Sequence, residues 1–390
     1  MTPAARVQSA IELLDAVIAA ARRGGASADR IVAEWFKTRR YMGSGDRRAV
    51  RELVYGAVRA CGEIPVSGRA ALLLVAKADP ALLTLFAGSN HGPAPLVPGE
   101  PVAGAGIAPR WLVELLAVSG IAGADAAALL GRAPLDIRIN TLKGAAPDLP
   151  LVGEPCAAPG ALRYPSGTPV EQWEAYNTGQ IEVQDAGSQL TCVALAASAG
   201  ETVIDLCAGA GGKTLALAAA MSGTGRLIAC DTDRGRLSRL PQRAARAGAT
   251  FIESRLLNPG RELDALGDLA ASADAVLIDA PCSGTGTWRR NPEGRWRLTP
   301  AELAQLTALQ LRLLDLGAAL VKPGGRLIYV TCSLLDAEGA DQAQAFLTRQ
   351  PGWVAAPLHL PAGAPRGAGL RLEPARDATD GFFVAQLIAP

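Results

Sequence analysis

The sequence predicts an α/β protein in which a doubly wound parallel sheet follows an all-helical N-terminal segment. From residue 180 onward, short apolar runs rich in β-branched residues alternate with helical stretches, as in a sheet that is buried on both faces. Apolar positions at helical spacing mark the N-terminal segment, and ten of the 22 residues from Gly88 to Pro109 are glycine or proline. The 390 residues are enough for two to three domains.

Composition and charge exclude several classes of protein. Hydrophobic residues make up 49% of the chain and the formal net charge is +1, which excludes a polycation, a disordered acidic chain and a collagen-like chain. No apolar run approaches the ~18–20 residues of a membrane span, and acids interrupt the apolar N-terminal stretch, unlike in a signal peptide. The seven cysteines are irregularly spaced and form no CxxC pair, so we expect no disulfide framework, no metal site and a cytoplasmic location.

The N-terminal segment is basic. Between Arg30 and Arg59 eight basic residues face three acids. The apolar residues recur at helical spacing and predict two amphipathic helices, with Asp46 as N-cap of the second. These apolar positions are Ile31, Trp35, Phe36, Val50, Val54 and Val58. The outer arginines form either a basic ridge for phosphate contacts or an ordinary solvated surface, and charge alone favours the second.

Beyond the linker, strands and helices can be placed along the chain. We expect a helix near Trp111 to Val118 and a strand at Leu135 to Thr141. Later runs that read as buried strands end at the sequences ETVIDLCAG, GRLIACDTD, DAVLIDAPC and GRLIYVTC, with helices at Lys213–Met221, Arg234–Ala247 and Pro300–Val321. Ligands of such sheets bind beyond the carboxyl ends of the strands, which is where the polar and cysteine-bearing sequences lie.

A glycine-rich turn, DLCAGAGGKT, follows the first of these buried strands. Gly209, Gly211 and Gly212 allow the backbone to turn sharply and to approach a ligand closely. A phosphate-binding P-loop needs glycine where Cys207 stands, and the spacing does not give the GxGxxG of NAD-binding proteins. The turn alone is therefore weak evidence for any particular ligand, and the residues at the ends of the neighbouring strands must identify it.

Acids follow two further strands. Asp231 comes 26 residues after Asp205 and suits the ribose hydroxyls of an adenosine-type ligand, with a helix N-cap as its alternative role. Asp279 ends another strand, in the sequence DAPC. The acid before the turn, the acid after the second strand and the DxPC sequence together match S-adenosylmethionine binding of class I, which is favoured over a nucleotide phosphate site.

Two cysteines stand just past apolar runs, Cys282 in DAPC and Cys332 in YVTC. In a methyltransferase-type strand order these strands are neighbours, so both thiols are expected at one rim of the sheet. A thiolate that adds to carbon 6 of cytosine makes carbon 5 nucleophilic enough to attack a sulfonium methyl group. A second thiol can then assist release of the product, and Asp279 can hold the pyrimidine edge. The remaining candidates, Cys192, Cys207 and Cys230, are expected to be small buried core residues.

The sequence after Cys282 adds an indication of RNA. Four arginines and one acid lie between Arg289 and Arg297, with Trp288 and Trp296 among them. Positive charge and aromatic rings suit a strand of RNA whose bases are unstacked.

These motifs together resemble the Sun/Nop family of RNA cytosine-5 methyltransferases, and most closely its bacterial small-subunit ribosomal RNA branch. The matching sequences are VQDAGSQL, DLCAGAGGKT, CDTDRGRL, DAPCSGTGTWRRNPEGRW, YVTCSLLDAEG and GFFVAQL; KTRRYMGSGDRRAVRELVYGAVR and APLDIRINTLK match N-terminal segments of that branch. The resemblance implies a class I S-adenosylmethionine-dependent methyltransferase with a Rossmann-like doubly wound sheet. It also implies an N-terminal all-α NusB-like RNA-binding domain and a short intermediate α+β segment.

The resemblance implies roles for individual residues and segments. Cys332 is implied as the nucleophile and Cys282 as the residue that assists release, and Asp279 completes the catalytic set. Cofactor contacts are implied for Cys207, Ala208, Gly209, Ala210, Gly211, Gly212, Lys213, Asp231 and Asp279, with Lys213 alternatively facing the target base. The expected segments are a helical RNA-binding domain at 1–88, a linker at 89–109, an intermediate segment at 110–180 and a catalytic domain at 181–390. The expected partner is ribosomal RNA or a pre-ribosomal particle; we expect no membrane partner and a monomer.

The chain departs from the family pattern at two points. Gly209-Ala210 stands where the family usually has Ala-Pro, and ESRLLNPG offers no acid near the adenine after the third strand. Two other methyltransferase classes are disfavoured, because the chain lacks the Glu-Asn-Val of DNA cytosine-5 enzymes and has DAPC where amino-group enzymes carry Asp/Asn-Pro-Pro-aromatic. A non-catalytic RNA-binding or ribosome-assembly factor is the remaining alternative, and the retained cysteines argue against it.

Overall fold

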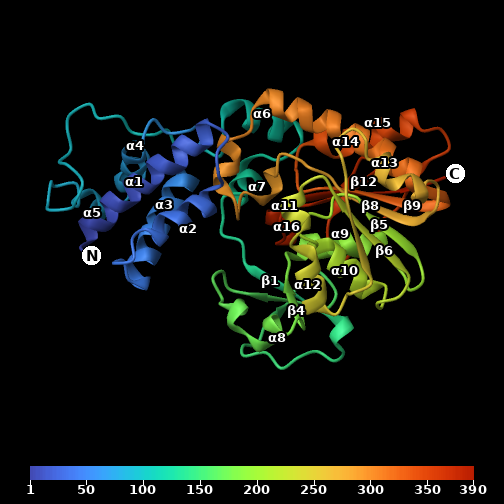
Figure 1. Ribbon diagram of the computed structural model, residues 1–390. Helices are drawn as coiled ribbons and strands as arrows, with labels where there is room; N and C mark the ends of the chain where they lie inside the picture. The colour runs from blue at the N-terminus through green and yellow to red at the C-terminus, as the bar shows by residue number, and fades with distance from the viewer. The chain divides into compact units, whose positions relative to one another are not determined.

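The computed structural model describes residues 1–390, which form two compact units (Figure 1). The first unit comprises residues 1–131 and 287–299, and the second comprises residues 132–286 and 300–390. Residues 287–299, which the sequence motifs group with the catalytic segment, therefore cluster with the N-terminal helices. None of the helices combines the length and the hydrophobicity that crossing a membrane requires.

The first unit is helical. Its helices are α1 (Pro3–Arg22), α2 (Ala28–Lys37), α3 (Ser44–Ala60), α4 (Gly68–Ala78), α5 (Pro80–Leu83), α6 (Arg110–Val118) and α7 (Gly123–Ala128). The apolar faces of α1 to α4 share one core, in which Leu13, Val54 and Leu72 are fully buried. Helices α2, α3 and α6 confirm the three helices expected from apolar spacing in this part of the chain.

The expected N-cap of α3 is wrong. The helix begins at Ser44 with Gly43 as its N-cap, and Asp46 lies inside the first turn. There the Asp46 carboxylate accepts a hydrogen bond of 2.8 Å from Arg6 Nε on α1. A carboxylate in the first turn is also stabilised by the helix dipole, so Asp46 supports this helix end without capping it.

The segment Thr287–Thr299 is packed into the first unit, and the expectation that its aromatic rings are available to RNA is wrong. Trp288 and Trp296 are 1% and 3% exposed. The fully buried Arg295 donates hydrogen bonds to the carbonyl oxygens of Val58 (2.5 Å) and Cys61 (2.8 Å) at the end of α3. The last carbonyl oxygens of a helix lack hydrogen-bond donors within the helix, and the Arg295 guanidinium provides the missing donors here.

The second unit begins with a small antiparallel sheet of order β2-β3-β1-β4. Its strands are β1 (Leu135–Ile139), β2 (Glu154–Pro155), β3 (Ala161–Tyr164) and β4 (Ile181–Val183). Strand β1 confirms the expected strand, although it ends two residues earlier because Asn140 and Thr141 start a short 3₁₀ turn.

The main sheet has the strand order β11-β12-β13-β9-β8-β5-β6-β7, with β10 paired to β13. The strands are β5 (Thr202–Asp205), β6 (Arg226–Asp231), β7 (Ile252–Leu256), β8 (Ala273–Asp279), β9 (Val321–Thr331), β10 (Val354–Ala356), β11 (Ala364–Arg366), β12 (Gly369–Leu372) and β13 (Phe382–Ile388). Strands β7, β6, β5, β8 and β9 run parallel, whereas β10 to β13 pair in antiparallel fashion.

Helices cover both faces of this sheet, as Figure 1 shows for α10 and α14. On one face, α9 (Ala186–Leu195), α10 (Gly212–Ala220) and α12 (Leu240–Ala247) pack against inward side chains such as Val203 and Leu227. On the other, α13 (Leu263–Leu266), α14 (Pro300–Leu320) and α15 (Ala340–Arg349) pack against the alternate residues, such as Ile204 and Ile228. The expected doubly wound α/β fold is confirmed.

Candidate active site

A cavity of about 620 Å³ lies beyond the carboxyl ends of β5, β6, β8 and β9. This is the position at which doubly wound sheets bind ligands, and the volume is in the usual range of small-molecule sites. Among its lining residues are Cys207, Asp231, Glu262, Asp279, Cys282 and Cys332. The cavity thus brings together the three expected catalytic residues and three of the nine expected cofactor contacts.

The two cysteines face each other at the rim of this cavity. Cys282 follows β8 and Cys332 follows β9, and these strands are parallel neighbours in register from Ala275 to Asp279. Their sulfur atoms are 3.3 Å apart. The adjacency expected from a methyltransferase-type strand order is therefore present, and the two thiols meet although 50 residues separate them.

The two sulfurs have different surroundings. The hydrogen bond with Cys332 raises the pKa of Cys282 well above its ordinary value, and burial and the Glu338 carboxylate raise it further. Cys332, by contrast, interacts with the ammonium group of Lys213. Negative charge therefore lies near one thiol and positive charge near the other.

Lys213 and Asp279 form an ion pair of 2.7 Å at the same end of the sheet. Burial lowers the pKa of the Lys213 ammonium, but the Asp279 carboxylate and the nearby thiols more than offset this effect, so the pKa lies above its ordinary value. Lys213 is the second residue of α10, and its ammonium lies 5.4 Å from the ring of Phe382. A charged Lys213 thus holds one oxygen of Asp279, whose side chain is 31% exposed.

The glycine-rich turn connects β5 to α10 in a conformation that needs glycine. Gly209 and Gly211 have φ angles of +57° and +88°. A side chain at Gly209 would also collide with the Arg236 guanidinium, 2.6 Å from the position of its Cβ atom. The Gly209 N–H donates to Asp231 Oδ2 at 2.6 Å, and the N–H of Asp233 donates to Oδ1 at 2.7 Å. The turn therefore fixes the Asp231 carboxylate at the cavity.

The other residues of the turn do not line the cavity. Ala208, Gly209, Ala210, Gly211, Gly212 and Lys213 shape the turn and the start of α10, while Cys207 lines the cavity directly. Cys192 and Cys230 are buried in the core as expected, and burial raises the pKa of their thiols to about 11 and about 12. Cys207 is only partly buried, so its expected place as a simple core residue is wrong.

Sequence reasoning missed two buried acids. Glu262 lines the cavity just beyond the stretch ESRLLNPG, where an acid was expected to be absent, and Arg312 holds it at 2.7 Å. Glu338 lies behind the two cysteine loops and is fully buried. Glu262 follows the end of β7 by six residues and lies at the start of the short α13. Site residues are expected directly after each strand, and Glu262 lies too far from the end of β7 to meet that expectation.

The cavity fits S-adenosylmethionine. Leu257, Pro259 and Leu313 give it an apolar part that suits an adenine ring, and its acids suit ribose hydroxyls and the positively charged sulfonium. The carboxylate of Asp231 is already oriented by two backbone N–H groups. Asp231, Asp279 and Cys207 are the residues that would hold this cofactor.

Comparison with known proteins identifies the family of the chain. A model of the family described as 16S rRNA methyltransferase RsmB/F matches residues 192–388. The chain belongs to this family. The match confirms the resemblance found in the motifs, and with it a class I methyltransferase fold that uses S-adenosylmethionine as cofactor.

The curated relatives carry related names. Ribosomal RNA small subunit methyltransferase B of Salmonella arizonae is 36% identical over 232 residues, which are 59% of this chain and 52% of the relative. The probable ribosomal RNA small subunit methyltransferase B of Synechocystis is 36% identical over 299 residues, which are 72% of this chain and 66% of the relative. The chain spans about half the length of the Salmonella relative that it matches.

Solved structures share the fold. The crystal structure of PH0851 has a TM-score of 0.75 and 25% identity, with 99% of both chains covered. A methyltransferase homologue from Pyrococcus horikoshii has a TM-score of 0.59 and 28% identity and covers 72% of this chain and 99% of its own. The first match spans both units of the chain, and both matches support the Rossmann-like fold of the second unit.

Proposed function

We propose that the protein methylates carbon 5 of a cytosine in small-subunit ribosomal RNA, with S-adenosylmethionine as methyl donor and a covalent bond between Cys332 and carbon 6 of the base as intermediate. The observation that carries the proposal is the 3.3 Å separation of the Cys282 and Cys332 sulfurs at one cavity. Methylation of an oxygen or an amino nitrogen needs no thiol, whereas carbon 5 of cytosine requires covalent activation. The family match supports ribosomal RNA as the substrate.

Cys332 is the sulfur that adds to the base. Cys332 interacts electrostatically with the charged Lys213, and nucleophilic cysteines are typically found in such electropositive surroundings. Cys282 has a carboxylate nearby instead, and its pKa is raised by its bond to Cys332, by burial and by Glu338. This difference supports the assignment of the nucleophile that the motifs imply.

Asp279 is the residue proposed to hold the pyrimidine. One of its oxygens accepts the bond from Lys213, and the other makes no hydrogen bond within the protein. The side chain lines the cavity between β8 and Cys282. A carboxylate here can bind the edge of the cytosine ring and stabilise the ring as the sulfur adds.

The residues act in a defined order. Bound S-adenosylmethionine supplies an electrophilic methyl group. Addition of the Cys332 thiolate to carbon 6 leaves an electron pair on carbon 5. This pair forms the bond to the methyl group as the bond between that methyl group and the sulfonium sulfur breaks, and S-adenosylhomocysteine is left as the second product. A solvent base then removes the proton from carbon 5, the double bond between carbons 5 and 6 forms again, and the electron pair of the C–S bond returns to Cys332. Cys282 lies 3.3 Å from that sulfur and assists its departure.

A labelling assay tests the proposal. Undermodified small-subunit ribosomal RNA is incubated with the protein and methyl-labelled S-adenosylmethionine, and the modified nucleoside is identified by mass spectrometry. The expected product is 5-methylcytosine. Label on another atom would contradict the carbon-5 chemistry, and tight RNA binding without label would favour a non-catalytic RNA-binding factor.

A further inference from the structure

The two cysteine-bearing loops are tied together by a carboxylate behind them. Glu338 follows Cys332 by six residues and accepts two hydrogen bonds from Ser283, the residue after Cys282. The backbone N–H of Ser283 donates at 2.8 Å, and its hydroxyl donates to the second carboxylate oxygen. Gln310 on α14 donates to Glu338 at 3.1 Å and to the carbonyl oxygen of Pro281 at 2.9 Å. Glu338 therefore fixes the Cys282 loop from both sides of the cysteine.

The position of Glu338 is unusual for an acid. Its side chain is 0% exposed, and neither lysine nor arginine is among its partners. A buried carboxylate without a cation is costly and is tolerated only when hydrogen bonds satisfy it. Here the donors are Ser283 and Gln310, and Ser283 directly follows Cys282.

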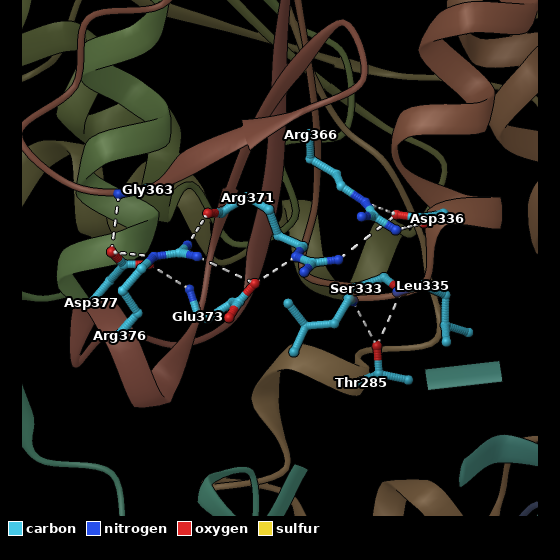
Figure 2. A network of polar contacts seen from close by, with 11 residues as sticks. Thr285, Ser333, Leu335, Asp336, Gly363, Arg366, Arg371, Glu373, Arg376 and Asp377 are labelled. Carbon is cyan, nitrogen blue, oxygen red and sulfur yellow. Dashed lines mark hydrogen bonds and ion pairs between the residues drawn. The ribbon is translucent and has the colours of Figure 1, made fainter. Parts of the chain in front are cut away.

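Further contacts hold the loop that carries Glu338. Thr285 bonds the hydroxyl of Ser333 at 3.1 Å and accepts the N–H of Leu334 at 2.8 Å. On the other side, Arg366 from β11 holds Asp336 in a bidentate ion pair (Figure 2). The segment between Cys332 and Glu338 is thus held from two directions, so the Glu338 carboxylate has a fixed position relative to both sulfurs.

The charged and titratable groups around Cys282 come from several elements. Cys332 lies at 3.3 Å, Glu338 approaches from the loop after β9, and Tyr329 on β9 interacts with the same thiol. The backbone N–H of Gly284 favours the charged form. Lys213, a cation of the site, interacts with Cys332.

We propose that Glu338 is a positioning residue that assigns the roles of the two sulfurs: it fixes the Cys282 loop through Ser283 and keeps Cys282 a neutral thiol that donates its S–H hydrogen bond to Cys332. This inference rests on the proposed function. A neutral S–H donor stabilises the Cys332 thiolate before it adds to the base and again when the C–S bond breaks, with the bonding electron pair returning to Cys332. No proton needs to leave Cys282 in either step.

Thiol alkylation tests the inference without RNA. The folded protein is treated with iodoacetamide at a series of pH values, and modification of the Cys282 and Cys332 peptides is followed by mass spectrometry. In the wild type, Cys332 should react at least about tenfold faster than Cys282 at neutral pH. Faster reaction of Cys282 would overturn the proposal even if no variant folds.

Substitution of the carboxylate isolates its charge. Glu338→Gln keeps the hydrogen-bonding shape and should shift the alkylation profile of Cys282 to lower pH by about one unit, whereas Glu338→Asp keeps the charge and should retain the wild-type profile. Asp341→Asn, which removes an exposed acid of α15, is the matched control and should change nothing. A Glu338→Gln profile that coincides with the wild type would overturn the proposal. The labelling assay above fails or succeeds separately, so loss of the proposed function and loss of this inference are distinguishable.

Discussion

The sulfur atoms of Cys282 and Cys332 lie 3.3 Å apart, although 50 residues separate them in the sequence. The pairing of β8 with β9 brings them together, and the backbone hydrogen bond from Gly286 N–H to the Cys332 carbonyl oxygen, at 3.0 Å, joins the two loops beyond the strands.

Replacing Cys282 by alanine should trap protein on RNA. The variant still adds Cys332 to the base, but the sulfur leaves slowly because its hydrogen-bond donor is gone. We expect the protein–RNA adduct under turnover conditions to rise at least about tenfold above the wild type, as seen on a denaturing gel. Cys156→Ala removes a thiol outside the cavity and serves as the control. An adduct level equal to that of the wild type would refute the release role of Cys282.

The basic surface of the first unit should contribute to RNA affinity. Arg40 and Arg48 are exposed, whereas Arg39 stacks on Trp35 at 3.7 Å. Each phosphate contact changes the slope of log affinity against log salt concentration by about 0.7–0.9. Replacing Arg40 and Arg48 together by glutamine should therefore flatten this slope by about 1.5, as measured by fluorescence anisotropy.

The control for that experiment is Arg110→Gln, which removes an exposed arginine that pairs with Glu114. It should leave the slope unchanged. If the double variant also keeps the wild-type slope, Arg40 and Arg48 belong to an ordinary solvated surface.

Asp205 should make stability depend on pH. The pKa of its carboxyl group is raised to about 7. Burial is the largest cause, and the carboxylates of Asp279 and Asp231 also raise the pKa, whereas the hydrogen bond from Thr214 and the charge of Lys213 lower it. Between about pH 4 and pH 7 the unfolded state loses this proton while the folded state keeps it, so the contribution of Asp205 to stability declines as the pH rises.

The variant Asp205→Asn removes this titration and keeps the shape of the side chain. Relative to the wild type, its free energy of unfolding should increase from pH 4 to pH 7 and level off above pH 7. Urea denaturation at four pH values measures the difference. A difference that is constant with pH would show that Asp205 titrates normally in the folded protein.

Arg295 should be needed for the stability of the first unit. Replacing it by methionine leaves the buried carbonyl of Val58 without this donor, and leaves the carbonyl of Cys61 with only the weaker bond of 3.3 Å from the Trp296 indole N–H. A buried group without a partner costs about 1–3 kcal/mol, so we expect a loss of roughly 1–3 kcal/mol in urea denaturation followed by tryptophan fluorescence. The exposed Arg48→Met should change stability by less than about 0.5 kcal/mol. An equal effect of the two substitutions would contradict the capping role of Arg295.

Much of the site could be predicted because its residues lie directly at the ends of strands or in a turn that needs glycine. The apolar runs before Asp231, Asp279 and Cys332 are β6, β8 and β9, and a parallel sheet brings their carboxyl ends to one edge. The positive φ angles of Gly209 and Gly211 explain why the turn after β5 carries glycines.

The predictions from sequence that are wrong concern residues whose surroundings are set by packing between distant parts of the chain. Trp288, Trp296 and Arg295 look like an RNA-binding segment because charge and aromatic content say nothing about burial. In the folded protein they complete the core and the helix end of a unit formed mainly by residues 1–131. The role of Glu338 could not be predicted for the same reason, because only the fold brings this residue into contact with Ser283.

The most direct test of the account is a search for the covalent bond itself. RNA containing 5-fluorocytosine at the target position cannot lose fluorine from carbon 5, so a methylated adduct should persist when the protein and S-adenosylmethionine are added. Digestion and mass spectrometry should find the nucleotide attached to the peptide that contains Cys332, and Cys332→Ser should abolish the adduct. Attachment to Cys282, or no adduct although the same RNA with ordinary cytosine is methylated, would contradict the proposed mechanism.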